Sequence, residues 1–184
     1  SLHYTRGLGY YEQFRVGDAF SAYGLENIFT AAGDTIANTD LIRRRWLDNH
    51  FYGTVFSYNY NKKALNLTLG GGANQYIGGH YGEVVWAQYA SNGQIRHRYY
   101  DDVATKNDVN FYAKLDYKIG DKLNLLVDLQ QRMIQYDFLG FDNELNSAGQ
   151  SVSASFFNPK AGVNFALNEK HSFYGFFGVG NKEP

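Results

Sequence analysis

Apolar and polar residues alternate with a period of two along much of the chain. Between Phe51 and Tyr60, bulky aromatic residues occupy one set of alternate positions and mostly smaller or polar residues occupy the other. After a short break, leucines from Leu65 to Leu69 alternate with Asn66 and Thr68. This pattern predicts two β-strands, each with one apolar and one polar face.

The same alternation recurs twice more, each time as two segments separated by a few polar residues. Leu126 is the one position that breaks it in the second pair, and the last segment is rich in Phe and Gly. We expect about 7–8 strands in all, most of them near or above the 9–11 residues that cross a bilayer at a tilt. The remaining strands are predicted near Leu2–Phe14, Val109–Tyr117, Leu123–Arg132, Pro159–Leu167 and Ser172–Gly180.

The predicted connections are of two kinds, and the two kinds alternate. Short turns fall near 61–64, 119–122 and 168–171, and long loops near 16–40, 77–106 and 136–155. All long loops of an up-and-down sheet then leave from the same end. Outer-membrane barrels have short periplasmic turns and long extracellular loops, with apolar residues facing lipid. The fold class predicted is therefore an all-β antiparallel up-and-down meander, part of a transmembrane β-barrel.

One alternative fold fits the same alternation. A soluble or surface β-barrel that binds a ligand inside would also show it, with the apolar face turned inward.

Composition narrows the function classes. Aromatic residues make up 17% of the sequence, and 20 Gly stand beside only 2 Pro, which favours a hydrogen-bonded sheet. A net charge of -1 argues against nucleic-acid binding, and the lack of Cys excludes disulfides and thiolate sites.

Five short motifs, in order along nearly the whole chain, carry a family resemblance. They lie at Tyr4–Phe14, Arg45–Asn49, His80–Ala87, Phe157–Gly162 and Asn181–Pro184. Together they resemble the β-barrel region of TonB-dependent outer-membrane receptors of the Bacteroidetes type. The resemblance implies a barrel of 22 strands that is closed by a plug domain and takes up scarce ligands with energy delivered through TonB. The chain itself shows no plug domain or signal peptide, so we expect it to be a segment of such a receptor, spanning 1–184.

The polar set of alternate positions contains the candidate functional residues. In the parent barrel this set is expected to line the lumen and to hydrogen-bond to the plug. The predicted lumen-lining residues are Asn66, Thr68, Asn74, Asn110, Lys114, Asp116, Asn124, Asp128, Gln130, Arg132, Asn158 and Lys160.

A second candidate set lies in the predicted loop near 77–106. His80, Glu83, Trp86 and His97 are expected to face a ligand there. Their spacing matches no established metal motif, so a solvated polar loop is the simpler interpretation and no metal site is predicted. The basic run Arg43–Arg45 beside Trp46 suggests contact with lipopolysaccharide phosphates or an anionic ligand, or a charged rim above an aromatic girdle.

The sequence predicts transport and not catalysis, because no catalytic triad or carboxylate pair stands out. The expected function is uptake of a siderophore, haem, cobalamin or similar nutrient in the bacterial outer membrane, and the resemblance gives the ligand no closer identity. The expected partners are outer-membrane lipid, a small-molecule ligand and, through the full-length parent, TonB and the plug domain. No cofactor is predicted. An isolated segment is expected to self-associate through its strand edges or to curl closed, because unpaired edges are unstable in water.

Overall fold

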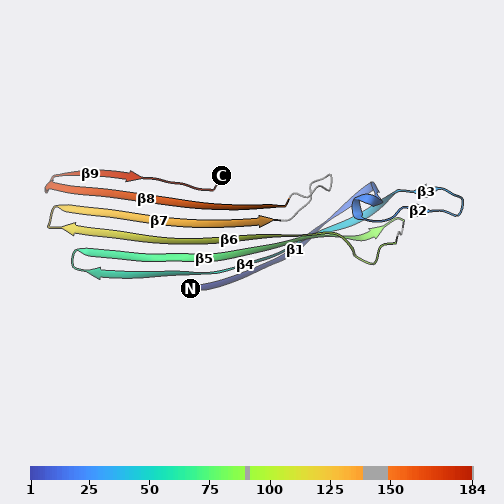
Figure 1. Ribbon diagram of the computed structural model, residues 1–184, viewed down its shortest axis with the longest axis horizontal. Coiled ribbons are helices and arrows are strands. Elements are labelled where there is room, and N and C mark those ends of the chain that lie inside the picture. The colour runs from blue at the N-terminus through green and yellow to red at the C-terminus, as the bar shows by residue number, and fades with distance from the viewer. Residues whose placement is uncertain (90–91, 139–148, 184) are drawn as a thin grey trace.

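The computed structural model describes residues 1–89, 92–138 and 149–183, and its main element is a single antiparallel sheet of seven strands (Figure 1). The strands lie in the sheet in chain order, β1-β4-β5-β6-β7-β8-β9, while β2 and β3 form a separate hairpin. The predicted antiparallel meander is therefore confirmed. The elements are β1 Leu2–Ala19, η1 Phe20–Tyr23, β2 Ile28–Phe29, β3 Thr35–Ile36, β4 Asn38–Lys62, β5 Leu65–Ala87, β6 His97–Ile119, β7 Leu123–Phe138, β8 Gln150–Asn168 and β9 His171–Gly178.

Strand register decides which residues share a face, because directly opposed residues of neighbouring strands point to the same side of a sheet. Thr68 on β5 lies opposite Lys114 on β6, and Lys114 lies opposite Asp128 on β7. Asp128 in turn lies opposite Lys160 on β8. One polar row therefore crosses four strands without a break.

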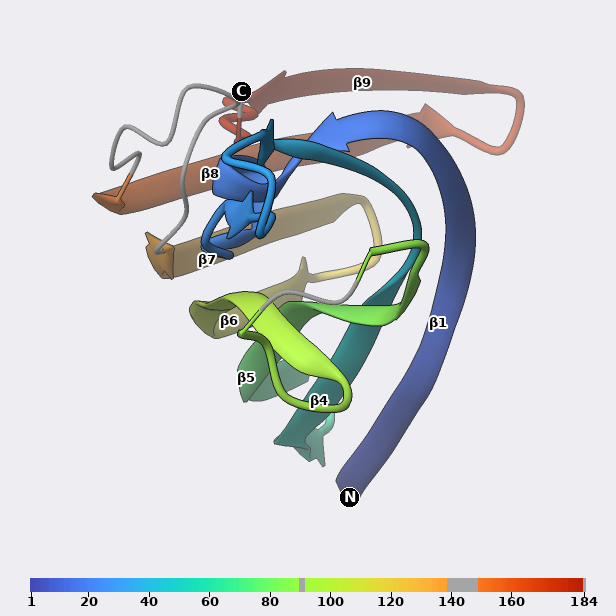
Figure 2. The same cartoon turned by 90° about the vertical axis from the view of Figure 1, so that its right-hand side faces the viewer.

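The sheet is curled, and the segment that contains η1 lies inside the curl (Figure 2). Tyr23 of η1 packs against Val84 of β5, and its backbone carbonyl accepts a hydrogen bond of 2.7 Å from Nε2 of His97 on β6. Val84 and His97 are paired across the strands and share the face that carries the polar row. The polar face is therefore the inner, concave face, and the apolar face is the outer one. This is opposite to the apolar interior of a soluble ligand-binding barrel.

Large apolar side chains are exposed on the outer face. Phe56 is 52% exposed, and Phe111 is 50% exposed. On β6 the outer apolar row runs from Val109 to Ile119, and about 10 residues at a tilt of roughly 40° cover about 25 Å, the height of a lipid-facing band. The outer row contains Tyr52, Phe56, Tyr58, Leu65, Leu67, Leu69, Phe111, Leu115, Leu123, Leu125, Val127, Val163, Phe165 and Leu167.

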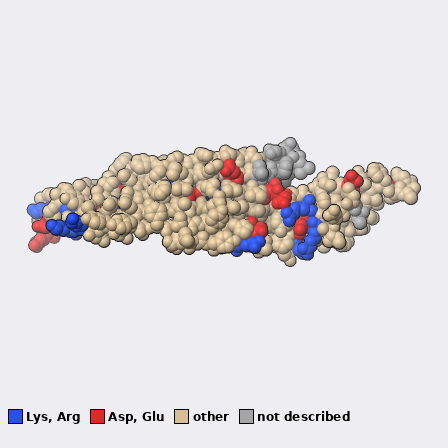
Figure 3. Space-filling model, turned by 60° about the horizontal axis from the view of Figure 1, so that its bottom comes forward, with Lys and Arg blue, Asp and Glu red and all other residues tan. Residues whose placement is uncertain are grey.

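Charged residues lie mostly beyond this band. In Figure 3 they gather at the end of the molecule that holds the turns and again toward the loop end, and most of the surface between them is uncharged. An exposed apolar surface of this extent is unfavourable in water and favourable in lipid. Among the described residues, no helix has the length and apolarity needed to span a membrane.

The prediction of a loop near 77–106 is wrong for most of that range. β5 continues to Ala87 and β6 begins at His97, so the connection is limited to residues 88–96. The two strands remain paired past the apolar band as far as Val84 and His97. Alternation of apolar and polar residues weakens there because neither face meets lipid, and the polar composition was therefore interpreted as a loop.

The other connections differ less from the prediction. Between β1 and β4, residues 20–37 hold η1 and the β2–β3 hairpin, so the predicted loop near 16–40 is shorter and partly ordered into secondary structure. Of the loop predicted near 136–155, β7 and β8 take both ends, and residues 139–148 lie outside the described residues. The turns lie at residues 63–64, 120–122 and 169–170, within the ranges predicted.

Candidate functional site

All twelve predicted lumen-lining residues lie on the concave face of the sheet. The register places them on β5, β6, β7 and β8 in facing rows. By strand, they are Asn66, Thr68 and Asn74, then Asn110, Lys114 and Asp116, then Asn124, Asp128, Gln130 and Arg132, and finally Asn158 and Lys160.

The carboxylate of Asp128 lies close to two ammonium groups near the turn end of this face. Oδ2 of Asp128 lies 4.0 Å from Nζ of Lys114 and 3.9 Å from Nζ of Lys160. One row lower, Nδ2 of Asn124 donates to Oδ2 of Asp116 over 3.2 Å. These cross-strand contacts hold polar side chains at fixed positions, and the exposed ammonium groups leave local positive charge on the inner wall.

A charged cluster higher on the concave face holds the segment after β9. Nη2 of Arg132 donates to Glu183 Oε1 over 2.8 Å, and Arg132 also pairs with Asp108 on β6. Nζ of Lys106 donates to the other oxygen of Glu183 over 2.7 Å. Glu183 therefore joins β6 and β7 across the inner wall.

Asn158 fixes the same segment one strand further along. Its side-chain oxygen accepts from the backbone N–H of Asn181 over 2.5 Å, and its Nδ2 donates to the backbone carbonyl of Asn181 over 3.2 Å. The amide thus replaces the strand partner that β8 loses where β9 ends at Gly178. Asn158 is 9% exposed, so these hydrogen bonds satisfy a buried polar group.

The four residues predicted to face a ligand from a loop do not lie together. His80 and His97 are on the concave face of β5 and β6, whereas Glu83 and Trp86 are on the convex face. Nε1 of Trp46 donates to Glu83 over 2.9 Å on that outer side. The prediction of one loop site is therefore corrected, because strand pairing sends alternate residues to opposite faces.

At the loop end, η1 is tied to the concave face through Tyr23, which is buried. The Tyr23 hydroxyl donates to Oδ2 of Asp18 over 2.6 Å, and Nη1 of Arg43 lies 3.4 Å from the same hydroxyl. Burial, followed by the hydrogen bond to Asp18, raises the pKa of Tyr23 to about 12. Burial also disfavours ionisation of Asp18, but hydrogen bonds from Tyr23 and Arg15 outweigh it and lower the pKa of Asp18.

The arginines on the convex face each have a carboxylate partner. Arg44 pairs with Glu12 at 2.6 Å, Arg6 with Asp48 at 3.0 Å and Arg98 with Asp101 at 2.5 Å. Arg44 also lies 4.1 Å from the Tyr10 ring centroid and 5.6 Å from that of Trp46, and Arg98 lies 3.9 Å from that of Tyr81. Since their charge is neutralised within the sheet, these arginines form the rim above the apolar band and not a ready phosphate site.

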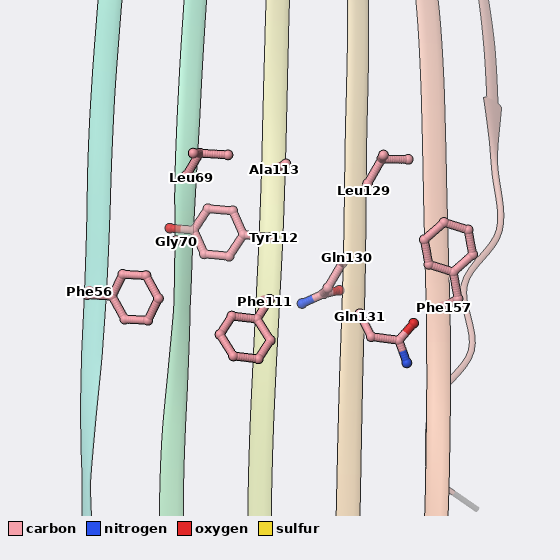
Figure 4. A pocket seen from close by; sticks show the side chains of 10 residues that line it. All are labelled: Phe56, Leu69, Gly70, Phe111, Tyr112, Ala113, Leu129, Gln130, Gln131 and Phe157. Carbon is pink, nitrogen blue, oxygen red and sulfur yellow. The ribbon is translucent and has the colours of Figure 1, made fainter.

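The apolar band contains an open depression between neighbouring strands (Figure 4). Phe56, Phe111 and Phe157 surround it, together with Leu69 and Leu129. The small residues Gly70 and Ala113 leave space between the larger side chains. Its lining is mostly apolar, with the amide of Gln131 as a polar group on the same face, and it suits a lipid chain.

Three inner residues at the loop end are not among the predicted lumen-lining residues, namely Tyr11, Tyr100 and Asp102. Together with Arg45, Leu47 and His80 they line a cavity of about 120 Å³ on the concave face. The signal that could have found them is the alternation itself, continued along β4, β5 and β6 beyond the apolar band. In the described part of the chain, no group of three or more His, Cys, Asp or Glu residues is arranged to hold a metal ion.

A curled antiparallel sheet with an uncharged convex band and a polar concave face is the wall of a transmembrane β-barrel. Comparison with protein families agrees with this class. Residues 1–184 match the family described as TonB dependent receptor-like, beta-barrel, and the chain belongs to that family. A search of curated proteins gives no match.

Proposed function

We propose that this chain forms part of the barrel wall of an outer-membrane receptor that takes up a scarce nutrient, such as a siderophore, haem or cobalamin, with energy supplied through TonB. The observation that carries the proposal is the uncharged convex band of bilayer height on a chain that matches a receptor barrel family throughout. The family supports an outer-membrane receptor or transporter. The particular nutrient stays open within this proposal.

In this proposal, the concave face forms the wall of the pathway that the nutrient takes through the barrel. Its polar side chains would contact the plug domain of the full-length receptor through hydrogen bonds and ion pairs. Exposed ammonium groups at Lys114 and Lys160 favour a plug surface with carboxylates at that height. The segment performs no covalent chemistry, because its polar residues stabilise one another in rows and do not converge on a reactive group.

Two measurements on the full-length protein test this function. Membrane fractionation should place the protein in the outer membrane, and electrophoresis should show faster migration of the unheated barrel than of the heated, unfolded chain. A soluble protein without heat-modifiable migration would contradict the proposal. In that case the apolar convex face would serve contacts between protein chains and not contact with lipid.

A further inference from the structure

A small pocket opens on the concave face at the loop end, above the apolar band. Tyr11, Arg45, Leu47, His80, Tyr100 and Asp102 contribute to its lining, and its volume is about 120 Å³. Three strands, β4, β5 and β6, and the edge strand β1 supply these side chains. The volume suits one small chemical group and not a large molecule, so the pocket is a subsite.

The arginines here differ from the other arginines of the sheet. Arg6, Arg15, Arg44, Arg98 and Arg132 each form an ion pair with a carboxylate. Within the ranges that the structure describes, the strand arginines without such a pair are Arg43 and Arg45. They are two residues apart on β4 and both face inward.

The partners of these two inner arginines are neutral. Arg43 donates to the Gln13 side-chain oxygen through Nε and Nη2, at 2.9 and 2.7 Å. Nε of Arg45 donates to the Tyr100 hydroxyl over 3.0 Å. Neither guanidinium forms an ion pair with a carboxylate, although the charge of Arg43 also acts on Asp18. A carboxylate or phosphate would therefore gain charge-assisted hydrogen bonds from Arg45.

A phenol beside the inner arginines lacks a hydrogen-bond partner. The Tyr99 hydroxyl is buried and makes no hydrogen bond with any described residue. Burial raises its pKa, whereas the nearby charges of Arg43 and Arg45 lower it. Tyr99 lies beside the pocket and not in its lining, and its ring packs edge-on against that of Tyr100, which does line it.

Glycine makes room for the tyrosines of this region. A Cβ at Gly82 would overlap both the Tyr99 and Tyr100 rings. Gly82 therefore lets the two rings lie over β5, with their centroids 5.0 Å apart. Arg45 sits 5.5 Å from the Tyr100 ring centroid and 5.9 Å from that of Tyr11, so its guanidinium is flanked by aromatic surface.

We propose that this pocket is a subsite for an aromatic carboxylate, in which Arg45 pairs with the anionic group and the Tyr11 and Tyr100 rings flank the ring that bears it. The inference rests on the proposed receptor function and specifies the chemistry of one end of the transported ligand. Asp102 lies in the same pocket, opposite His80 on the neighbouring strand, and is the one carboxylate among its lining residues. Arg43 adds positive charge beside the pocket, and part of that charge acts on Asp18, whose pKa it helps to lower.

The test uses the purified full-length receptor and arginine modification by phenylglyoxal, with the rate at each arginine followed by peptide mass spectrometry. Benzoate is the probe, and benzamide is its neutral control of nearly the same shape. At a benzoate concentration of about twice its Kd, labelling of Arg45 should slow about threefold, because only the unoccupied site reacts. Arg98, on the convex face, should be labelled at the same rate with and without benzoate.

A pair of conservative variants separates the subsite from general anion binding. Tyr100→Phe keeps the ring that lines the pocket but removes the hydroxyl that accepts from Nε of Arg45, and several times more benzoate should then be needed for the same protection of Arg45. Tyr10→Phe makes the same change on the convex face and should leave protection unaltered. Equal protection by benzamide, or no protection of Arg45 by benzoate, would overturn the subsite. The receptor assignment would survive either result, because fractionation and heat-modifiable migration test it separately.

Discussion

Glycine and tyrosine act together at the scale of single residues. A Cβ at Gly70 would overlap the ring of Tyr112 on the neighbouring strand, which lies across the glycine on the concave face. The ring covers the backbone of β5 and shields its hydrogen bonds from water. A glycine leaves room within a strand, and at Gly70 the Tyr112 ring uses that room.

Gly70→Ala is therefore expected to destabilise the barrel by about 1–3 kcal/mol, because Tyr112 must leave its position to avoid the new methyl group. Gly7→Ala is the matched control, since nothing lies within 4 Å of its Cβ position. It should change stability by less than about 0.5 kcal/mol. Urea unfolding of the full-length receptor measures both. Similar losses for the two variants would show that the Tyr112 contact is unimportant.

A charge placed on the two faces should have unequal effects. Val127→Lys puts an ammonium group near the middle of the apolar band and is expected to cost about 2–4 kcal/mol. Asn124→Lys places the same group on the concave face of the same strand, where water and polar side chains solvate it, so its cost should be smaller. Unfolding in lipid vesicles compares the two. An equal cost would contradict the assignment of the faces.

At the scale of elements, η1 depends on the ionisation of Asp18. The pKa of Asp18 is lowered in the folded protein, so ionised Asp18 stabilises the fold at pH values above its unfolded pKa of about 3.9. This stabilisation is lost as the pH falls below that value and through the lowered folded pKa. Hydrogen-exchange protection of residues 20–24 should therefore decrease over this acid range.

Asp18→Asn is the control for that titration. In the variant, residues 20–24 should be less protected from hydrogen exchange at neutral pH than in the wild type. Acidification should then cause no further loss of protection through the side chain at position 18. Asp48, which pairs with Arg6 on the convex face, provides the comparison, because Asp48→Asn should leave the acid response of η1 intact. If η1 of Asp18→Asn responded to acid as the wild type does, another group would be responsible.

Glu183 holds the segment after β9, and we expect its ion pairs to make a small contribution to the free energy of unfolding. Glu183 is about a third exposed, with its side chain 35% accessible, and its two cationic partners are 31% and 34% accessible. Solvent screening limits such pairs to about 1 kcal/mol or less. A double-mutant cycle of Glu183→Gln with Lys106→Met should report a coupling of that size. A coupling near zero would leave Arg132 and Asn158 as the groups that hold the segment.

The sequence predicts the elements well where lipid imposes a strict period and less well elsewhere. The β4–β5 turn and the faces of Leu65–Leu69 follow directly from alternation. Beyond the band, β5 and β6 contain bulges next to Val85 and Tyr99, where the register shifts by one residue. Each bulge changes the relation between residue number and face, so the separation of His97 from Glu83 could not be read from spacing. The position of η1 depends on tertiary contacts of Tyr23 that no local pattern encodes.

At the scale of the whole molecule, long strands and short turns define a direction. β4 has 25 residues and β5 has 23, well above the roughly 9–11 that span a bilayer. The extra length lies at the end that carries η1 and the inner pocket, so the sheet projects from the membrane on that side. Outer-membrane barrels have their longer loops on the extracellular side, so we expect the pocket to face the outside of the cell, where a ligand arrives.

The orientation of this sheet in the outer membrane is tested most directly by labelling single cysteines on intact cells, since the sequence has no Cys. In the full-length receptor, Ile95→Cys lies in the connection between β5 and β6 at a side chain that is 97% exposed, and Asp121→Cys lies in the β6–β7 turn. A membrane-impermeant maleimide should label the cysteine at position 95 and reach the one at position 121 only after the outer membrane is broken. Labelling at position 121 but not at 95 on intact cells, or at both, would contradict the account.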